Sequence, residues 1–288
     1  MADSLEAVRL RIHGVRQLDA VIGAMRNIAA AHAQQSKSLL PGFRAYAEVV
    51  AQAIAQARRL HGEYVHGAAG RTNMRRAQIV FCAEHGFAGN FSEHVLAAAG
   101  EADAVLLIGS RGNALLDARH VKPAWQSPMA TRVSSVTPLC TRIADALYRL
   151  LPEHGLGMVD AVCPLWRPGT GLSVEHRSLL PLDERRFHGI VNRMPPLTTL
   201  PPDVLLENLA AEYVYAELCQ MAMQAFVAEN EARAAAMVRA RSNVQDMLAK
   251  LQASERLVRQ EAITAELVEL AGAIRPPSHG AQARRRDD

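Results

Sequence analysis

The feature that most constrains the fold is an uninterrupted helical pattern near the end of the chain. From Asp203 to Ala271 the sequence contains neither Gly nor Pro, and it is rich in residues that lose little side-chain freedom in a helix. Pro202 suits a first helical position, and Gly272 suits a C-terminal stop. At 1.5 Å per residue, such a helix would be about 100 Å long. One compact domain cannot cover it, so part of the helix must be covered by something else.

A second helical pattern lies at the start of the chain. Apolar residues recur at helical spacing from Val8 to Ile28. We expect Pro41-Gly42 to kink or break this helix. Gly14 and Gly23 weaken it, unless their small size lets another helix come close.

The two terminal helices can cover each other. Residues 1–60 hold eight Lys or Arg against four Asp or Glu, whereas residues 203–271 hold six against eleven. This complementarity predicts an antiparallel coiled coil. We expect its seam on the last helix to contain Met237, Ala240, Val244, Met247 or Leu248, Leu251, Val258, Ile263, Leu267 and Leu270. Two ordinary helices packed on one globule are the alternative.

Between the helices the pattern changes to short apolar runs separated by helical segments. We expect strands at 77–83, 104–108, 158–163 and 173–180, and helices at 92–99, 113–119 and 137–151. Strands that alternate with helices predict a small, Rossmann-like α/β domain with a mainly parallel sheet, inserted between the coiled-coil helices.

Four segments are therefore expected. They are an N-terminal coiled-coil helix (1–60), an α/β domain (70–190), a C-terminal coiled-coil helix (203–273) and a disordered tail (274–288). The arginines near the end of the tail are interpreted as solvated rather than as a nucleic-acid or lipid site.

Composition excludes several classes of protein. The net charge of +3 gives no strong argument for nucleic acid or an anionic membrane. The four cysteines are far apart and form no CxxC pair, which indicates reduced thiols. The charged N-terminus has no apolar signal region, and no run of about 18 apolar residues occurs, so we expect membrane association only through partners.

The sequence shows no catalytic constellation. The turns His85–Gly89 and Gly109–Gly112 each follow a predicted strand, but neither is a complete phosphate-binding motif. Both are interpreted as tight turns before helices. The eleven histidines are scattered, with no HExxH. We expect no catalytic residue, no metal and no cofactor, because an enzyme interpretation would rest on fold alone.

The two ends of the chain carry a specific resemblance. The segments Arg11–Val15, Ile22–Ala30 and Arg259–Ala273 resemble the terminal helices of the gamma subunit of F-type rotary ATPases. Glu231, Arg233, Met237 and Asn243 are in the expected order, and Ile108–Gly112 is similar to that family's second strand and turn.

This resemblance implies a rotor shaft that is not itself an enzyme. Its partners would be the alpha and beta subunits of F1, the epsilon subunit and the c ring of Fo. Its rotation would couple ion flow to ATP synthesis or hydrolysis, by forcing the beta subunits through different conformations. Its location would be peripheral, on the cytoplasmic face of the bacterial inner membrane.

The resemblance also implies four contacts with the beta subunit, at Arg259, Gln260, Thr264 and Met25. Gln260 and Thr264 suit contacts that form and break on rotation, since a neutral hydrogen bond contributes only about 0.5–1.5 kcal/mol. Arg259 could bind a carboxylate more strongly.

Some positions depart from the family pattern. Gly23, His32, Gln34 and Gln35 stand where basic residues are usual. These departures suggest a divergent bacterial branch of the alternative type. Two other functions remain open: a coiled-coil scaffold or adaptor without rotation, and a small nucleotide-binding enzyme with helical arms.

Overall fold

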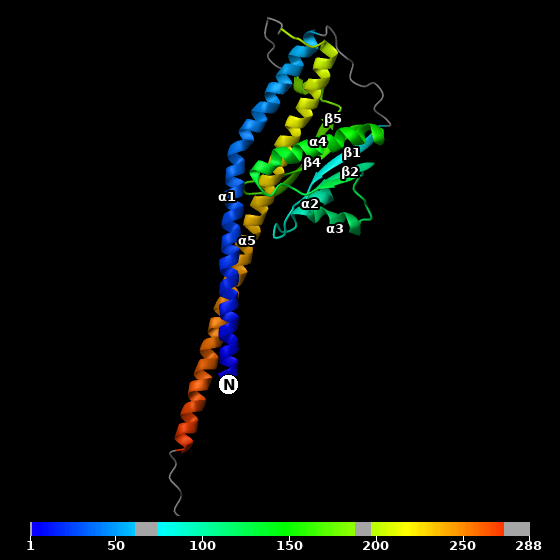
Figure 1. Cartoon of the computed structure of the whole chain (residues 1–288). Coiled ribbons are helices and arrows are strands. Elements are labelled where there is room, and N and C mark those ends of the chain that lie inside the picture. Colours follow the sequence, from blue (N-terminus) through cyan, green and yellow to red (C-terminus); the bar gives the residue numbers. More distant parts are fainter. Residues whose placement is uncertain (1, 61–73, 188–196, 274–288) are drawn as a thin grey trace, which may run out of the picture. The chain divides into compact units, whose positions relative to one another are not determined.

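The computed structural model describes residues 2–60, 74–187 and 197–273. Two helices are much longer than the others: α1 (Ala2–Leu60) and α5 (Pro202–Ala273), blue and yellow to red in Figure 1. Pro202 begins α5 and Asp203 lies in its first turn, where a negative charge is favourable. The predicted long helix is confirmed to within two residues at each end. The predicted disordered tail lies outside the described residues.

Of the expected kink or break in α1, the break is wrong, because the helix continues through Pro41 and Gly42. Pro41 and Gly42 are both exposed, while Ser36 and Ala47 on either side are buried. Burial of the flanking turns therefore holds the helix together across one missing backbone hydrogen bond. The idea of a close neighbour at the glycines is also wrong, since a Cβ added at Gly14 or Gly23 would meet nothing within 4 Å.

A five-stranded sheet has the order β3-β2-β1-β4-β5. β1 is parallel to β2 and β4, β2 is parallel to β3, and β5 is antiparallel to β4. The bounds are β1 (Arg75–Phe81), β2 (Ala104–Ile108), β3 (Trp125–Ser127), β4 (Leu156–Arg167) and β5 (Gly171–Leu180). The four predicted strands and the mainly parallel sheet are confirmed. β3 was not predicted, because three residues without an apolar run give no periodic signal.

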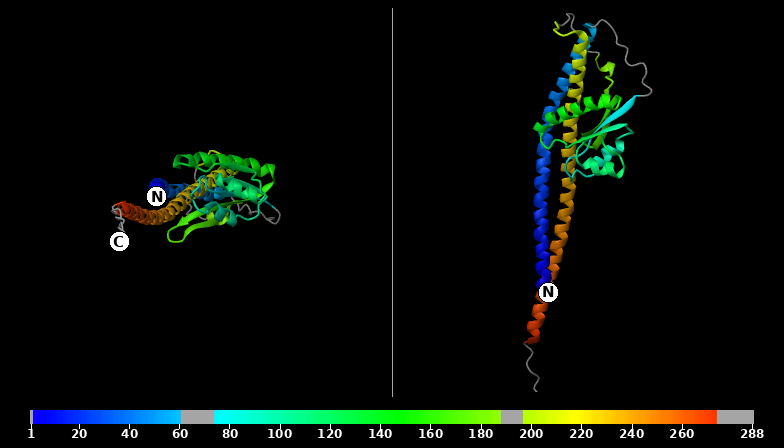
Figure 2. Two further views of the ribbon diagram at one scale, coloured as in Figure 1. Left: turned by 90° about the horizontal axis from the view of Figure 1, so that it is seen from below. Right: turned by 45° about the vertical axis from the view of Figure 1, so that its right-hand side comes forward.

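Helices cover both faces of this sheet. The remaining helices are α2 (Phe91–Ala98), α3 (Arg111–Ala118) and α4 (Val136–Glu153), with two 3₁₀ turns at Val133–Ser135 and Glu184–Phe187. On one face α4 and α5 share a core with the strands, and α4 crosses α5 in Figure 2. On the other face α2 and α3 pack on the sheet. The predicted α/β fold with three short helices is confirmed.

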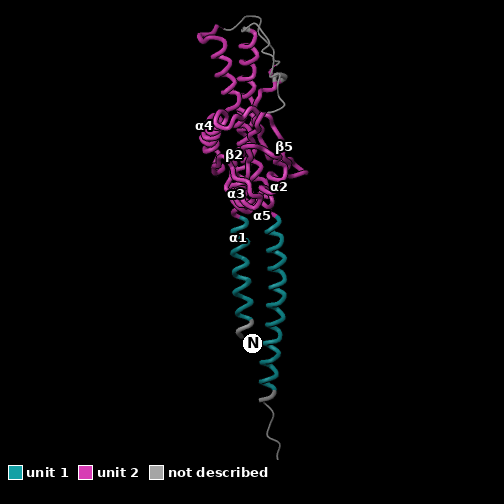
Figure 3. The backbone as a smooth tube through the Cα atoms, turned by 90° about the vertical axis from the view of Figure 1, so that its right-hand side faces the viewer, with its two compact units in different colours: residues 1–23, 239–288 teal, residues 24–238 magenta. Residues whose placement is uncertain are grey.

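The chain divides into two compact units, coloured separately in Figure 3. Unit 1 comprises residues 1–23 and 239–288, and its described part is the start of α1 and the end of α5. Unit 2 comprises residues 24–238 and contains the sheet and its helices.

In unit 1 the two helices are paired antiparallel. The Arg9 guanidinium binds the Glu255 carboxylate at 2.9 Å, and the Arg241 guanidinium binds the Asp19 carboxylate at 3.1 Å. Most shielded positions alternate in steps of three and four residues, which is the period of a coiled coil. They are Leu5, Val8, Ile12, Val15, Asp19 and Ile22 on α1, and Arg241, Val244, Leu248, Leu251, Glu255, Val258, Ala262 and Ala265 on α5.

The predicted seam is confirmed at Val244, Leu248, Leu251 and Val258 and is wrong near the end of the helix. There Ile263, Leu267 and Leu270 are exposed. α1 begins less than about two turns before Arg9, whereas α5 continues about five turns beyond Glu255. Within the described residues of unit 1, the last turns of α5 therefore extend past the start of α1.

Within unit 2, α1 and α5 are also in contact with each other. Lys37 on α1 forms an ion pair with Glu231 on α5, and the Tyr46 hydroxyl donates to the Glu212 carboxylate. Residues 216–230 of α5 are buried on every side, between α1 and the sheet domain.

Candidate functional site

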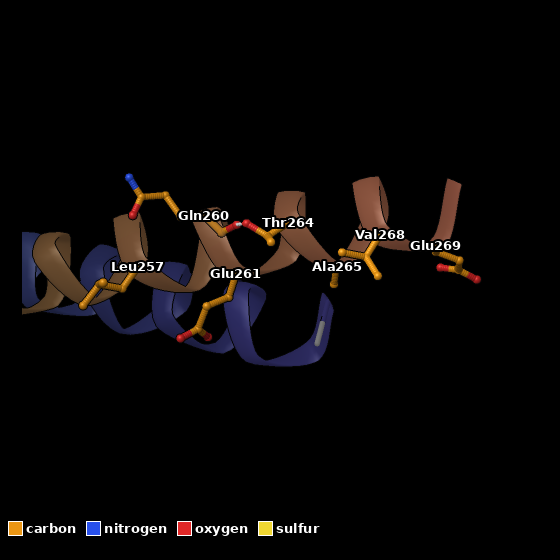
Figure 4. A pocket seen from close by; sticks show the side chains of 7 residues that line it. All are labelled: Leu257, Gln260, Glu261, Thr264, Ala265, Val268 and Glu269. Carbon is orange, nitrogen blue, oxygen red and sulfur yellow. Dashed lines mark hydrogen bonds between the residues drawn. The ribbon is translucent and has the colours of Figure 1, made fainter. Parts of the chain in front are cut away.

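Three of the four predicted contact residues lie on the exposed end of α5 in unit 1. Arg259, Gln260 and Thr264 are all exposed. The Thr264 hydroxyl donates a hydrogen bond to the Gln260 carbonyl oxygen at 2.8 Å, and the Gln260 amide points away from α1 (Figure 4). The side-chain amide of Gln260 is thus presented outward from the helix.

A shallow groove runs along the same stretch of α5 (Figure 4). It brings Gln260 and Thr264 together with apolar and acidic neighbours. The residues that line it are Leu257, Gln260, Glu261, Thr264, Ala265, Val268 and Glu269. Arg259 is not among them. This mixed surface suits a partner segment that offers both apolar side chains and hydrogen-bond donors.

The fourth predicted residue, Met25, belongs to unit 2 and is half-buried. The structure therefore does not assign it to the same unit as the other three residues. Met25 lines a pocket of about 480 Å³ with Ile28, His32 and Phe226, and the turn between β1 and α2 also lines it. Phe87 at the tip of that turn is 66% exposed and has a φ of +65°, an uncommon backbone conformation for a bulky residue.

A buried carboxylate on α5 lies in the same pocket and was not predicted. Glu229 is 3% exposed. Its Oε1 accepts hydrogen bonds from the backbone N–H of Glu84 at 3.2 Å and of His85 at 3.4 Å, and Arg233 forms an ion pair with it. Burial raises the pKa of Glu229, and the nearby Arg233 charge and the two backbone donors oppose that rise. The sequence signal was weak: one Glu four residues before an Arg in a helix.

The carboxylate of Glu84, which follows β1, binds the segments that follow β2 and β3. The Glu84 side chain accepts hydrogen bonds from the Ser110 backbone at 3.1 Å, the Ser110 hydroxyl at 2.7 Å and the Met129 backbone at 2.8 Å. The interpretation of His85–Gly89 and Gly109–Gly112 as tight turns is confirmed: α2 follows the first, and α3 begins within the second.

Metal and membrane features are absent from the described ranges of the chain. Within residues 2–60, 74–187 and 197–273, no group of three His, Cys, Asp or Glu side chains could hold a metal ion. No helix in those ranges is long and apolar enough to cross a membrane.

Solved structures share this arrangement of two long helices and a sheet domain. A structure titled as the rotor of the Euglena gracilis mitochondrial ATP synthase matches with a TM-score of 0.62 and 9% identity, covering 91% of this chain and 100% of that one. One titled as the central stalk and c-ring of the Tetrahymena thermophila enzyme matches with a TM-score of 0.55 and 16% identity, covering 76% and 99%. This chain therefore shares its fold with chains of these two structures.

The family is also shown at the level of sequence. A family model described as ATP synthase matches residues 4–275, so this chain belongs to the ATP synthase family. Its curated relatives include the ATP synthase gamma chains of Symbiobacterium thermophilum, 23% identical over 94% of this chain and 98% of the relative, and of Acetivibrio thermocellus, 22% identical over 93% and 97%.

Proposed function

We infer that this chain is the gamma subunit of an F-type ATP synthase, the central rotor shaft that couples ion flow through the membrane sector to ATP synthesis or hydrolysis. The observation that carries the inference is the family match over residues 4–275. The end of α5 agrees with it, because a helix with exposed Leu257, Ile263 and Leu267 suits enclosure by other subunits.

The shaft itself is not catalytic in this proposal. Its partners are the alpha and beta subunits, the epsilon subunit and the c ring. Each angle of the shaft favours a different conformation of each surrounding subunit, which is how rotation acts on distant nucleotide sites. The chain is peripheral on the cytoplasmic face of the bacterial inner membrane, held there by its partners.

The test is co-expression with candidate alpha and beta subunits, followed by native mass determination and an ATPase assay. We expect a complex of three alpha, three beta and one copy of this chain, with activity that depends on this chain. A chain that stays alone or pairs only with itself would contradict the rotor and favour the scaffold alternative.

We further propose that Arg259, Gln260, Thr264 and Met25 contact the beta subunits. Replacing both Gln260 and Thr264 with Ala is expected to lower coupled ATPase activity severalfold, since each lost hydrogen bond contributes about 1 kcal/mol. The fold of the isolated chain should be unchanged, because both side chains are exposed.

The matched control is Gln245→Ala, an exposed polar residue on the same helix. Its activity should equal that of the wild type. Equal activity in the Gln260 and Thr264 variant as well would remove these two residues as contacts.

A further inference from the structure

Glu229 lies in the most thoroughly buried part of α5. Taking a carboxylate out of water is costly, and replacing a buried ion pair with apolar residues often leaves a protein equally stable. Glu229 nevertheless sits there at 3% exposure, beside Phe226 and Ala228. The buried charge is therefore poorly explained by stability alone, and its partners indicate what else it does.

Glu229 and Arg233 together bind both the N–H and the carbonyl groups of one backbone turn. Glu229 accepts from the N–H groups of Glu84 and His85. Arg233, one helical turn further along α5, donates from Nε to the Gly86 carbonyl at 3.3 Å and from Nη2 to the His85 carbonyl at 3.4 Å. Two side chains of one helix therefore bind the turn that ends β1, at consecutive residues.

Glu84 connects this turn to the ends of two further strands, β2 and β3. Its backbone N–H is bound to α5, while its side chain binds Ser110 after β2 and Met129 after β3. The carboxyl ends of three neighbouring parallel strands are thus connected to α5 through one continuous set of hydrogen bonds.

Most of the remaining contact between α5 and the sheet domain is apolar. The exceptions include the Glu217 carboxylate of α5, which lies 4.0 Å from Arg177 of β5 and 3.6 Å from Arg186. The α5 side of the apolar core includes Cys219, Met221, Ala222, Met223 and Ala225. Small side chains and flexible methionines fill space well, but apolar burial is non-directional. Such a surface resists separation more than it resists sliding or turning. Hydrogen bonds are directional, so they resist sliding and turning as well as separation.

We propose that Glu229 and Arg233 are positioning residues that lock the sheet domain to α5, so that the two turn as one body when the shaft is loaded. This proposal rests on the rotor function proposed above. In this proposal, torque on α5 acts on the turn at residues 84–86 through Glu229 and Arg233. Glu84 transmits it to the ends of β2 and β3 through its hydrogen bonds with Ser110 and Met129.

The test compares variants in the assembled complex, reconstituted in lipid vesicles. Glu229→Gln removes the charge, and Arg233→Lys keeps the charge but loses the planar fork that reaches two carbonyls. The control is Glu231→Gln, because Glu231 is on the same helix but pairs with Lys37 of α1 instead of the turn. Two quantities are measured: amide hydrogen exchange at residues 84 and 85, and the ratio of ATP-driven ion pumping to ATP hydrolysis.

In Glu229→Gln we expect exchange at residues 84 and 85 to rise by about tenfold or more, the scale of a lost bond to a charged group. The ratio of pumping to hydrolysis should fall severalfold while hydrolysis continues. Arg233→Lys should lower the same ratio, and Glu231→Gln should change neither quantity. A general loss of stability would lower pumping and hydrolysis together and leave their ratio intact.

Faster exchange with an unchanged ratio would overturn the proposal, as would unchanged exchange in Glu229→Gln. Failure of both variants to assemble would assign the pair a purely structural role and also overturn it. The wild-type chain separates this proposal from the rotor function: if it supports no coupled pumping, the rotor function itself fails.

Discussion

Gly109 shows how closely the backbone is packed where β2 leads into α3. Its φ is +97°, and a Cβ at this position would lie 2.1 Å from the Cys82 carbonyl oxygen. Hydrogen bonds from the Gly109 N–H to the Ser127 carbonyl at 2.9 Å and from the Arg111 N–H to the Ala83 carbonyl at 3.0 Å hold the strands this close. Only glycine fits here.

Gly109→Ala is therefore expected to lower the free energy of unfolding by about 3 kcal/mol or more, because it combines backbone strain with a clash against rigid backbone. Gly155→Ala is the control: its φ is +60°, but a Cβ there meets nothing within 4 Å. It should cost only about 1–2 kcal/mol. Urea unfolding of the isolated chain measures both, and equal losses would refute the role assigned to the clash.

Single residues of the candidate site were the hardest to predict. The turn at Gly109 could be recognised from the sequence, because glycines after a strand suggest a tight turn. Glu229 could not, since its role depends on a turn about 145 positions earlier in the chain coming within hydrogen-bond distance. Periodicity describes one element at a time and carries no information about such an approach.

At the scale of elements, α5 was predictable and its seam was only partly so. The absence of Gly and Pro was sufficient to predict the helix. The predicted seam favoured large apolar residues such as Ile263, but the structure shields Ala262 and Ala265 instead. It also places the charged residues Arg241 and Glu255 on the seam, each with a partner on α1. Hydrophobicity alone does not identify seam positions that are small or charged.

Leu251 tests the continuity of α5. Leu251→Pro removes a backbone hydrogen bond and introduces a clash, at a cost of about 3 kcal/mol or more. We expect it to abolish assembly with alpha and beta subunits. Leu251→Ala, which only removes side-chain packing at this half-buried position, should assemble with a smaller loss of thermal stability. Normal assembly of the proline variant would contradict the need for an unbroken helix.

At the scale of the whole molecule, unit 1 exposes several large apolar side chains. Leu10, Leu257, Leu267 and Val268 are each 60% exposed or more. Large exposed apolar patches mark interaction sites or lead to aggregation. The isolated chain should therefore be prone to associate, and its partners should suppress that association.

Replacing Leu267 and Leu270 with Glu is expected to reduce self-association of the isolated chain and to weaken assembly with alpha and beta subunits by about tenfold or more, because charge replaces apolar contact. Light scattering of the chain alone and native mass determination of the mixture measure the two effects. Glu266→Gln, at an exposed polar position nearby, is the control. Assembly that is unchanged by the double substitution would exclude this surface as a contact.

The three-and-four spacing of the seam has a mechanical consequence. A straight α-helix has 3.6 residues per turn, so a seam that repeats every 3.5 residues makes the paired helices wind around each other with a left hand. A pair wound in this way tightens when its end is twisted in one direction and loosens in the other. Twisting the end of unit 1 is therefore expected to have different effects in the two senses of rotation, because one sense winds the helices further around each other and the other unwinds them.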